Sequence, residues 1–582
     1  MRNLIRVVTI AAVTVAIAGC AARTPFAAES TTEMAAMSAA MNAPSSGNTD
    51  ADFVAKMIPH HQGAIAMAQS ELRYGQNEQL RRLAQEIIVT QKDEISAMHL
   101  AVARNDTVEG VETANVPIAA APISHRDRVY AAEQFSNTVS VTDPADNKLL
   151  GVIRLGDPQP GNLSPLYRGQ VLVHGMGFSP DHKTLAIVSI GTNSVSFIET
   201  ATNAVKHVTY VGRAPHEAFF TPDGAELWVT IRGEDYVAVL DGRTYEEKTR
   251  IKVPNGPGMT IFSPDGKFGY VCSSFSPKTM VIAVADHRVV GEVVQDSPFC
   301  PNIAATPDGT QVWLTLKDVG KVMVFDARPP FTVLKTIFTG PITNHVNFSN
   351  TPRGLFAYVS IGGKNQVQVF RTTDFAKVAT IPVGALPHGV WPSSDGSRIY
   401  VGLENGDGLA VINTESNRVI ATVPIGQGPQ AIAYVPDAVP EGPGTAGLEH
   451  LGLAGDATHL VMASVSSERT ADSAGEYPTS VTLFDQGLTQ VLEAAVSGLD
   501  ARQPYVLGLS KLPNGSGDIE ALAGFTTNPA GSAIVNTVGR IRQSVRDTTN
   551  ASRRYLVIVR GTPDKLGALV QVQVVAREKG GG

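Results

Sequence analysis

The middle of the chain repeats one short pattern of apolar and polar positions. Between residues 125 and 436, an apolar run is followed by Ser/Thr-Pro-Asp-Gly, a second β-type run, an Asn/Asp turn and Val-x-Val-x-Asp. The unit recurs about every 42 residues, which is the length of one four-stranded propeller blade. The β-runs begin near Val129, Leu185, Leu227, Phe268, Val312, Phe356 and Ile399. The pattern therefore predicts a mainly β protein centred on a seven-bladed β-propeller over residues 125–436.

The two ends of this repeat region complement each other. The first β-run has no inner strand before it, whereas residues 429–435 form an inner strand with no blade after it. Giving the last strand to the first blade would remove both open sheet edges. We expect the ring to close in this way, and we expect residues 158–170, an insertion between the first two copies, to form a surface loop.

A second β-rich region follows a Gly/Pro-rich linker at residues 437–450. Within residues 451–582, alternating runs such as 479–484, 490–496 and 570–575 are separated by Gly, Pro and Asn turns. We expect a separate C-terminal all-β domain, β-sandwich-like or an open barrel, in which no residues concentrate chemistry.

Residues 51–104 change from strand alternation to helical periodicity. Apolar residues recur at helical spacing at Leu80, Leu83, Ala84, Ile87, Ile88 and Ile95. This spacing predicts an N-terminal pair of antiparallel helices, about 52–74 and about 77–103, joined near Gly75. Pro59 should kink or restart the first helix. The flanking stretches, 21–50 and 105–124, have the composition of a flexible tether and a linker.

The first twenty residues have the form of an export signal. Arg2 and Arg6 precede an apolar stretch that is too short to span a membrane as a mature helix. The segment ends in Ile-Ala-Gly-Cys20, which resembles the bacterial lipobox; an ordinary signal peptide with a chance Cys is the alternative. The resemblance implies a lipoprotein signal peptide at 1–20 and lipidation of Cys20, which would anchor the protein in a membrane. With Ala21 next, we expect the periplasmic side of the outer membrane, or the cell surface.

Composition narrows the class of partner. The chain has 582 residues, too many for one ordinary domain, and its 43% hydrophobic and 17% charged residues are typical of globular domains. Its formal net charge is -7 and no run of Lys or Arg occurs. Because phosphate backbones are bound by basic patches, we expect no nucleic-acid partner.

The most specific chemical motif lies in the first predicted helix. Met57 is three and four residues before His60 and His61, so that their side chains share a helix face. Met67 lies two turns beyond His60 on that side. Thioether and imidazole donors suit copper, and the lack of Cys in this segment argues against zinc. The alternative is that the Met side chains only fill a small core.

The second predicted helix would add donors to the same site. Glu94 and Met98 are four residues apart, and His99 is adjacent to Met98. Antiparallel pairing of the two helices would bring these side chains towards those of the first helix. Farther upstream, Met34, Met37 and Met41 are also at helical spacing.

Residues 57–68 resemble a family with the pattern Met-x-Pro-His-His-x-x-Ala-x-x-Met-Ala, which includes periplasmic copper-binding proteins of the CopM type. The resemblance covers about 55 residues. It implies copper or silver binding through Met57, His60, His61, Met67 and Met98. Glu94 and His99 come from spacing alone.

The central repeats resemble the YVTN-type propeller repeat, whose first copy here is residues 129–143. In each copy, the residue that begins the innermost strand should stand at the mouth of the channel. That residue is a histidine at His174, His216, His345 and His388. Such a ring resembles the histidines that hold copper in nitrous-oxide-reductase-like propellers, although three of seven positions here lack one. The imidazoles would bind a metal or an anionic ligand, or would only bond to backbone at the channel rim.

Two further cysteines, Cys272 and Cys300, fall at the same predicted mouth, on neighbouring blades. Because an exported chain meets an oxidising compartment, a disulfide is expected. A thiolate pair near the histidine ring is the alternative.

These features favour a non-enzymatic copper-handling protein of metal homeostasis or resistance. Its helical module would capture the ion, and its propeller would present a rigid platform to other envelope proteins. No nucleophile elbow, phosphate loop or zinc-protease helix is found. Two alternatives remain: a copper- or cofactor-dependent oxidoreductase centred on the histidine ring, and an envelope scaffold without metal.

Overall fold

The structure is a computed structural model, and it separates into two compact units, residues 1–107 and 108–582. It describes residues 34–35, 37–42, 45–47, 49–77, 80–81, 84, 87–88, 91, 95, 122–156, 171–452, 457–465, 478–486, 489–539, 541, 545 and 553–575. The lipobox cysteine Cys20, the second-helix donors Glu94, Met98 and His99, and the whole of the predicted 158–170 loop lie outside these residues.

The first unit contains one long described helix, α2 (Thr49–Tyr74). Asp52 in its first turn accepts hydrogen bonds from the Ser46 backbone N–H and hydroxyl, at 2.6 and 2.7 Å. A carboxylate at this end complements the helix dipole. The helix continues through Pro59 instead of restarting there. Gly75 follows it, and the described positions from Leu80 to Ile95 are again helical.

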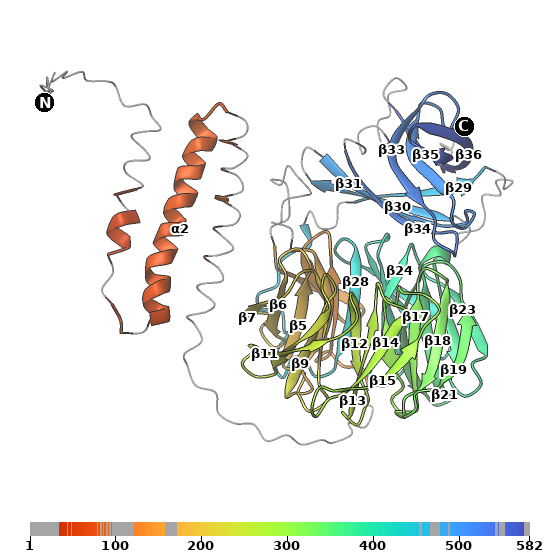
Figure 1. The fold of residues 1–582 in the computed structure, drawn as a ribbon, viewed down its shortest axis with the longest axis horizontal. Coiled ribbons are helices and arrows are strands. Elements are labelled where there is room, and N and C mark those ends of the chain that lie inside the picture. Colours follow the sequence, from red (N-terminus) through yellow and green to blue (C-terminus); the bar gives the residue numbers. More distant parts are fainter. Residues whose placement is uncertain are drawn as a thin grey trace, which may run out of the picture. The chain divides into compact units, whose positions relative to one another are not determined.

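The second unit begins with seven four-stranded antiparallel sheets, which confirms the predicted propeller (Figure 1). The first three blades, from inner to outer strand, are β28 (Pro429–Val435), β1 (Arg128–Glu133), β2 (Thr138–Asp143) and β3 (Lys148–Arg154); β4 (Val173–Phe178), β5 (Thr184–Ser189), β6 (Ser194–Glu199) and β7 (Val205–Tyr210); and β8 (Pro215–Phe220), β9 (Glu226–Ile231), β10 (Tyr236–Asp241) and β11 (Glu247–Lys252).

The remaining four blades repeat this order. They are β12 (Pro257–Phe262), β13 (Phe268–Ser273), β14 (Lys278–Ala283) and β15 (Val289–Val294); β16 (Ile303–Ala305), β17 (Gln311–Leu316), β18 (Lys321–Asp326) and β19 (Val333–Phe338); β20 (Thr343–Thr351), β21 (Gly354–Ile361), β22 (Gln366–Arg371) and β23 (Lys377–Pro382), with a 3-10 turn, η1 (Gly362–Lys364), inside this blade; and β24 (Pro387–Pro392), β25 (Arg398–Leu403), β26 (Gly408–Asn413) and β27 (Arg418–Pro424).

The ring closes through strands from the two ends of the repeat region. β28 pairs with β1 in antiparallel register, with Ala131 opposite Ile432. The first blade therefore takes its inner strand from the end of the repeats, as predicted, and neither strand is left with an open edge.

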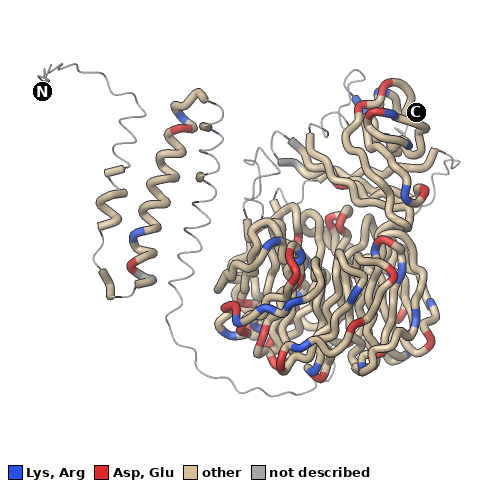
Figure 2. Tube along the Cα trace, in the orientation of Figure 1, with Lys and Arg blue, Asp and Glu red and all other residues tan. Residues whose placement is uncertain are grey.

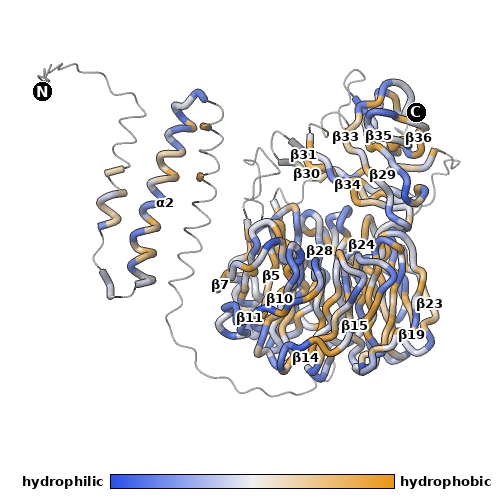
Figure 3. Tube along the Cα trace, in the orientation of Figure 1, coloured by the Kyte–Doolittle hydropathy of each residue, from blue (hydrophilic) through white to orange (hydrophobic). Residues whose placement is uncertain are grey.

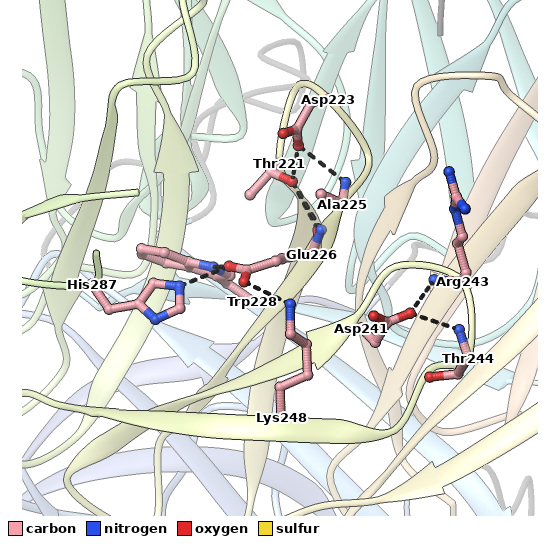
Figure 4. A network of polar contacts seen from close by, with 10 residues as sticks. All are labelled: Thr221, Asp223, Ala225, Glu226, Trp228, Asp241, Arg243, Thr244, Lys248 and His287. Atoms are coloured by element: carbon pink, nitrogen blue, oxygen red, sulfur yellow. Dashed lines mark hydrogen bonds and ion pairs between the residues drawn. The ribbon is translucent and has the colours of Figure 1, made fainter. Parts of the chain in front are cut away.

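A Ser/Thr-x-Asp turn stabilises five of the seven blades at the end of the inner strand (Figure 4). The Thr221 hydroxyl donates to Asp223 Oδ1 at 2.6 Å, and the same oxygen accepts from the Ala225 N–H at 3.0 Å. The Glu226 N–H donates to the Thr221 hydroxyl at 3.0 Å. Because these bonds satisfy turn groups locally, the motif fixes the reversal between the first and second strands. The same hydroxyl-to-carboxylate contact recurs at Ser179–Asp181, Ser263–Asp265, Thr306–Asp308 and Ser393–Asp395.

A second repeated hydrogen bond links neighbouring blades, at the end of the blade opposite to the Ser/Thr-x-Asp turn. In the turn between the second and third strands, the side chains of Asn137, Asn193 and Asn365 accept the backbone N–H of Leu172, Ala214 and Leu386. Each accepting residue and each donating residue has a positive φ. An Asn tolerates this left-handed conformation, which explains the Asn turn of the repeat.

The propeller core lies between the blades. The inner three strands of each blade are almost fully buried, whereas outer strands such as β11 and β19 are mostly exposed. Apolar stretches lie along many strands, whereas the outer strand β11 is mostly hydrophilic (Figure 3). Lys, Arg, Asp and Glu are interspersed along the described part of the propeller (Figure 2).

The C-terminal domain is one eight-stranded antiparallel sheet, so of the two expected forms the open barrel applies and the sandwich does not. Its order is β33-β32-β35-β36-β29-β30-β31-β34. The edge strands β33 and β34 approach each other, which nearly closes the barrel. The strands are β29 (Ala457–Ser464), β30 (Thr479–Gln486), β31 (Thr489–Val496), β32 (Pro504–Ser510), β33 (Ile519–Thr526), β34 (Ala533–Gly539), β35 (Tyr555–Thr562) and β36 (Lys565–Gln573).

This sheet packs on the propeller within the second unit. Phe484 of β30 stacks on Phe135, with ring centroids 4.2 Å apart. The Asn405 amide donates to the Ser480 hydroxyl at 3.1 Å. These contacts involve loops that follow the second strands of blades, at the mouth where the inner strands begin. Among the described residues, no helix has the length and apolar character needed to cross a membrane.

Candidate metal centres

Four predicted donors lie along α2. Met57, His60 and Met67 fall on one side of a helix with 3.6 residues per turn, and His61 lies beside them. Met57 and Met67 are half-buried and His60 is exposed. The donors therefore stand at the border between the packed and the open side of the helix.

His61 is turned towards the packed side and is nearly buried. Its Nδ1 lies 2.8 Å from the carbonyl oxygen of Met57. Because a carbonyl only accepts, Nδ1 carries the proton and the lone pair of the neutral ring is on Nε2. A histidine fixed in this way by backbone has the tautomer that many metal-binding histidines use.

Met37, from the upstream Met cluster, contacts the same helix. A Cβ added at Gly63 would lie 2.4 Å from Met37 Sδ, so the absence of a side chain at Gly63 makes room for this thioether. Gly63 is one turn from both His60 and Met67. The sequence showed the spacing of Met37 but not this contact.

The four histidines of the propeller occupy equivalent positions at the channel mouth. His174, His216 and His388 are the second residues of β4, β8 and β24, and His345 is the third residue of β20. Each side chain is at most 8% exposed. A residue with positive φ precedes each by two or three positions, namely Leu172, Ala214, Leu386 and Ile342. This repeated turn directs the start of every inner strand to the same ring.

The structure groups the four histidines as two neighbouring pairs. His174 Nε2 lies 3.0 Å from His216 Nε2, and the His345 and His388 ring centroids are 4.6 Å apart. Burial lowers the pKa of His174 well below its usual value, and the positive form of His388 lowers it further. Burial likewise lowers the pKa of His388 to about 3.

The Nδ1 partners distinguish His345 from the other three. His216 Nδ1 and His388 Nδ1 face the carbonyl oxygens of the next blade, at 2.7 and 2.9 Å. His345 Nδ1 instead lies 3.3 Å from the Asn302 amide nitrogen. The Asn302 oxygen accepts from the Val346 N–H at 2.9 Å, which fixes the orientation of that amide. His345 Nδ1 therefore accepts, and its proton is on Nε2.

Glu217 is a site residue that the sequence did not single out. It is 3% exposed, and it offers a carboxylate oxygen within 4.8 Å of ligand atoms of His174 and His216. In a regular strand, His216 and Glu217 would point to opposite faces. The pairing of β8 with β9 is interrupted between Pro215 and Ala218, and such an irregularity can redirect a side chain. Burial raises the pKa of Glu217 to about 8.

A second layer of polar side chains surrounds the ring. Gln134, Arg232, Lys317 and Glu404 each follow the second strand of a blade directly. Burial lowers the pKa of the Lys317 ammonium and raises the pKa of Glu404. Glu493 of β31 joins this layer from the C-terminal sheet. Burial raises the pKa of Glu493 well above its usual range, and the negative charge of Glu404 raises it further.

Cys272 and Cys300 lie together as buried free thiols, rather than as the expected disulfide. The Cys272 thiol donates to the Cys300 carbonyl at 3.4 Å, and the Cys300 thiol donates to the Asn302 carbonyl at 3.2 Å. Burial raises the pKa of Cys300 well above its usual range, which disfavours the alternative of a thiolate pair.

Known protein families match two parts of the chain. Residues 18–102 match a domain of unknown function, DUF305, and residues 200–419 match the lactonase family of seven-bladed β-propellers. None of the curated proteins compared matches the chain.

Among solved structures, Kuenenia stuttgartiensis hydrazine synthase is 22% identical, with 49% of this chain and 92% of that chain covered and a TM-score of 0.42. Pseudomonas aeruginosa periplasmic gluconolactonase is 18% identical, with 53% and 99% covered and a TM-score of 0.43. A functionally unknown protein from Desulfotomaculum acetoxidans is 14% identical, with 53% and 98% covered and a TM-score of 0.45. The chain thus contains an N-terminal region that matches DUF305 and a central seven-bladed propeller, part of which matches the lactonase family.

Proposed function

We propose that this protein is an exported, lipid-anchored copper-binding protein that takes up Cu(I) through its N-terminal helical domain. The observation that carries the proposal is the row of soft donors on α2, where Met57, His60 and Met67 share one side of the helix. Met37 Sδ, resting on Gly63, adds a third thioether to that side.

The chemistry of these donors is selective. Thioether sulfur is a soft, neutral ligand that favours Cu(I) or Ag(I) over the harder divalent ions, and imidazole binds copper in both oxidation states. Met98, and with it Glu94 and His99, would complete the site from the second helix. Cys20 would carry the lipid anchor, which places the site in the envelope.

The propeller's part in this function is that of a rigid platform for another envelope protein. Its blades share one closed ring, and the inner strands are fixed to their neighbours by repeated side-chain contacts. Such a scaffold holds its exposed loops in fixed positions, which favours recognition of a partner.

Competition for Cu(I) tests the proposal. The full mature chain should withdraw Cu(I) from a chromophoric chelator such as bicinchoninate at micromolar protein, and Met57→Leu/Met67→Leu should weaken this at least tenfold. Leu conserves volume and helix propensity, so the helical content measured by circular dichroism should stay unchanged. Met323→Leu, at a buried propeller position 2% exposed, is the matched control and should bind as the parent does.

Two results would contradict the copper function. Failure of the parent chain to compete for Cu(I) would favour a metal-free envelope scaffold. Undiminished binding by the double variant would show that the thioethers of α2 are not ligands.

A further inference from the structure

A second group of potential metal ligands lies inside the propeller and consists only of residues of the second unit. His174 and His216 come from the inner strands of adjacent blades, and Glu217 follows His216. Their side chains are 8%, 5% and 3% exposed, and ligand atoms of the three lie within 4.8 Å of one another. Three potential ligands thus meet in the interior, and the Met176 backbone N–H also donates to the Glu217 carboxylate.

The protons on the two imidazoles are arranged unusually. His216 Nδ1 lies 2.7 Å from the Gly258 carbonyl oxygen, and His174 Nδ1 lies 3.1 Å from Gln134 Oε1. Both partners are acceptors, so in neutral rings both Nδ1 atoms carry the proton. The two Nε2 lone pairs then face each other across 3.0 Å, which is repulsive unless a cation stands beside both.

The space around Glu217 is kept open by a glycine. A Cβ added at Gly175 would lie 2.5 Å from Glu217 Oε2 and 2.1 Å from the His216 carbonyl oxygen. Gly175 stands directly after His174, so the close approach of the carboxylate to the histidine pair depends on the missing side chain.

From this geometry we propose that His174 Nε2, His216 Nε2 and the Glu217 carboxylate bind a divalent first-row transition metal ion. Oxygen acceptors on the Nδ1 atoms are the outer partners that metal-binding histidines use. Two histidines and one carboxylate form a three-ligand set that leaves further coordination positions for an exogenous ligand.

The spacing of the nitrogens indicates the coordination geometry. With metal–nitrogen distances of about 2.05 Å, nitrogens 3.0 Å apart subtend an angle of about 95° at the metal. A tetrahedral site would require nitrogens about 3.3 Å apart. The site therefore favours six-coordinate or tetragonal ions such as Co(II), Ni(II) or Cu(II) over tetrahedral zinc.

The basic side chains nearby favour an anionic additional ligand. Lys317 and Arg232 both contribute positive charge at His174. Arg232 Nε is buried without a hydrogen-bond partner among the described residues, and the guanidinium lies over the rings of Phe275 and Phe299 at 5.5 Å. A carboxylate or similar anion on the open side of the metal would be stabilised by these two cations.

Co(II) is the probe for this site because its spectrum reports coordination and because thioethers bind it poorly. The experiment uses the full mature chain with Met57→Leu, His60→Gln, His61→Gln and Met67→Leu, because these substitutions remove the described donors of α2. Bound metal is first removed from this variant with a chelator. We expect one equivalent of Co(II) to remain after dialysis, with the weak visible absorption of a six-coordinate ion.

Variants in the ring identify the ligands. Glu217→Gln, which preserves shape, and His174→Gln should each weaken Co(II) binding at least tenfold with the Tm of the propeller retained. His345→Gln is the matched control, because His345 holds an equivalent ring position but its Nδ1 accepts from Asn302. It should retain the Co(II) equivalent.

Other outcomes overturn the proposal. If the folded chain retains no Co(II), the proposal is wrong. The Gln134 amide then donates to His174 Nδ1, and His174 Nε2 carries a proton that it donates to His216 Nε2 in an ordinary hydrogen bond. If Co(II) is retained but Glu217→Gln has no effect, the ligands lie elsewhere. The Cu(I) competition of the parent chain is independent of both results, so failure here leaves the function of the helical domain standing.

Discussion

At the scale of single residues, Glu133 shows how the closure of the ring depends on a buried acid. Its Oε1 accepts the Gly426 N–H at 2.8 Å, and the Thr138 hydroxyl donates to its other oxygen. Burial raises the pKa of Glu133 to about 7 from the usual 4.5. The carboxyl is therefore neutral in the folded protein under conditions in which it is ionised in the unfolded chain.

This shift makes stability depend on pH. Because the folded pKa lies above the unfolded one, the stabilisation is fully present below pH 4.5 and is lost as the pH rises through 7. The loss is about 3 kcal/mol for a shift of this size. Glu133→Gln, which cannot ionise, should lose less Tm than the parent between pH 5 and pH 8. Parallel Tm profiles of parent and variant over this range would contradict the assignment.

The ring histidines could be predicted from the sequence because the turn aspartate stands at a constant distance from the start of the inner strand in these copies. Counting back from the turn aspartate reaches His174, His216 and His388 at equivalent strand positions. Glu217 could not be predicted, because a residue that follows a strand histidine should point to the other face. The interrupted pairing of β8 brings it to the histidines. The same interruption recurs in β4 and β24, but there a glycine follows the histidine.

At the scale of elements, β28 holds the first blade to the rest of the ring. Every residue of this strand is buried, and Ile432 packs among Tyr400, Tyr434 and Val129. The sequence predicted the strand exchange because an unpaired inner strand at each end of the repeats would leave two edges. It left the C-terminal domain open between a sandwich and a barrel, because short alternating strands are typical of both.

Substitution within β28 tests the closure. Ile432→Ala should cost about 2–4 kcal/mol, since it removes buried methyl groups and leaves a cavity between two blades. Ile420→Ala is the matched control on β27 of the neighbouring blade, because Ile420 is 49% exposed. Urea unfolding of the full chain, followed by tryptophan fluorescence, measures both. Equal losses for the two variants would mean that β28 does not close the ring.

At the scale of the whole second unit, the C-terminal sheet covers the mouth where the histidine ring lies. Its contacts come from several blades: Ser497 donates to the Gly363 carbonyl at 2.9 Å, and the Ala530 N–H donates to the Asp318 carbonyl at 3.0 Å. Ala495 packs with Ile342 and Leu386. Because these contacts span several blades, the sheet should leave the mouth as one body, and the burial of Lys317 and Glu404 should depend on it.

Phe135→Ala tests this docking at its aromatic contact. The substitution removes the stack on Phe484 and should open the interface, so that amide hydrogens in residues 480–496 exchange at least tenfold faster. Strand β9, inside the propeller, should keep its protection. Phe275→Ala is the matched control, because Phe275 follows a second strand at the same mouth but is 56% exposed. If Phe135→Ala changes exchange in β9 and in residues 480–496 alike, the sheet and the propeller unfold together, and the sheet is part of the propeller's folding unit rather than a cover that can leave it.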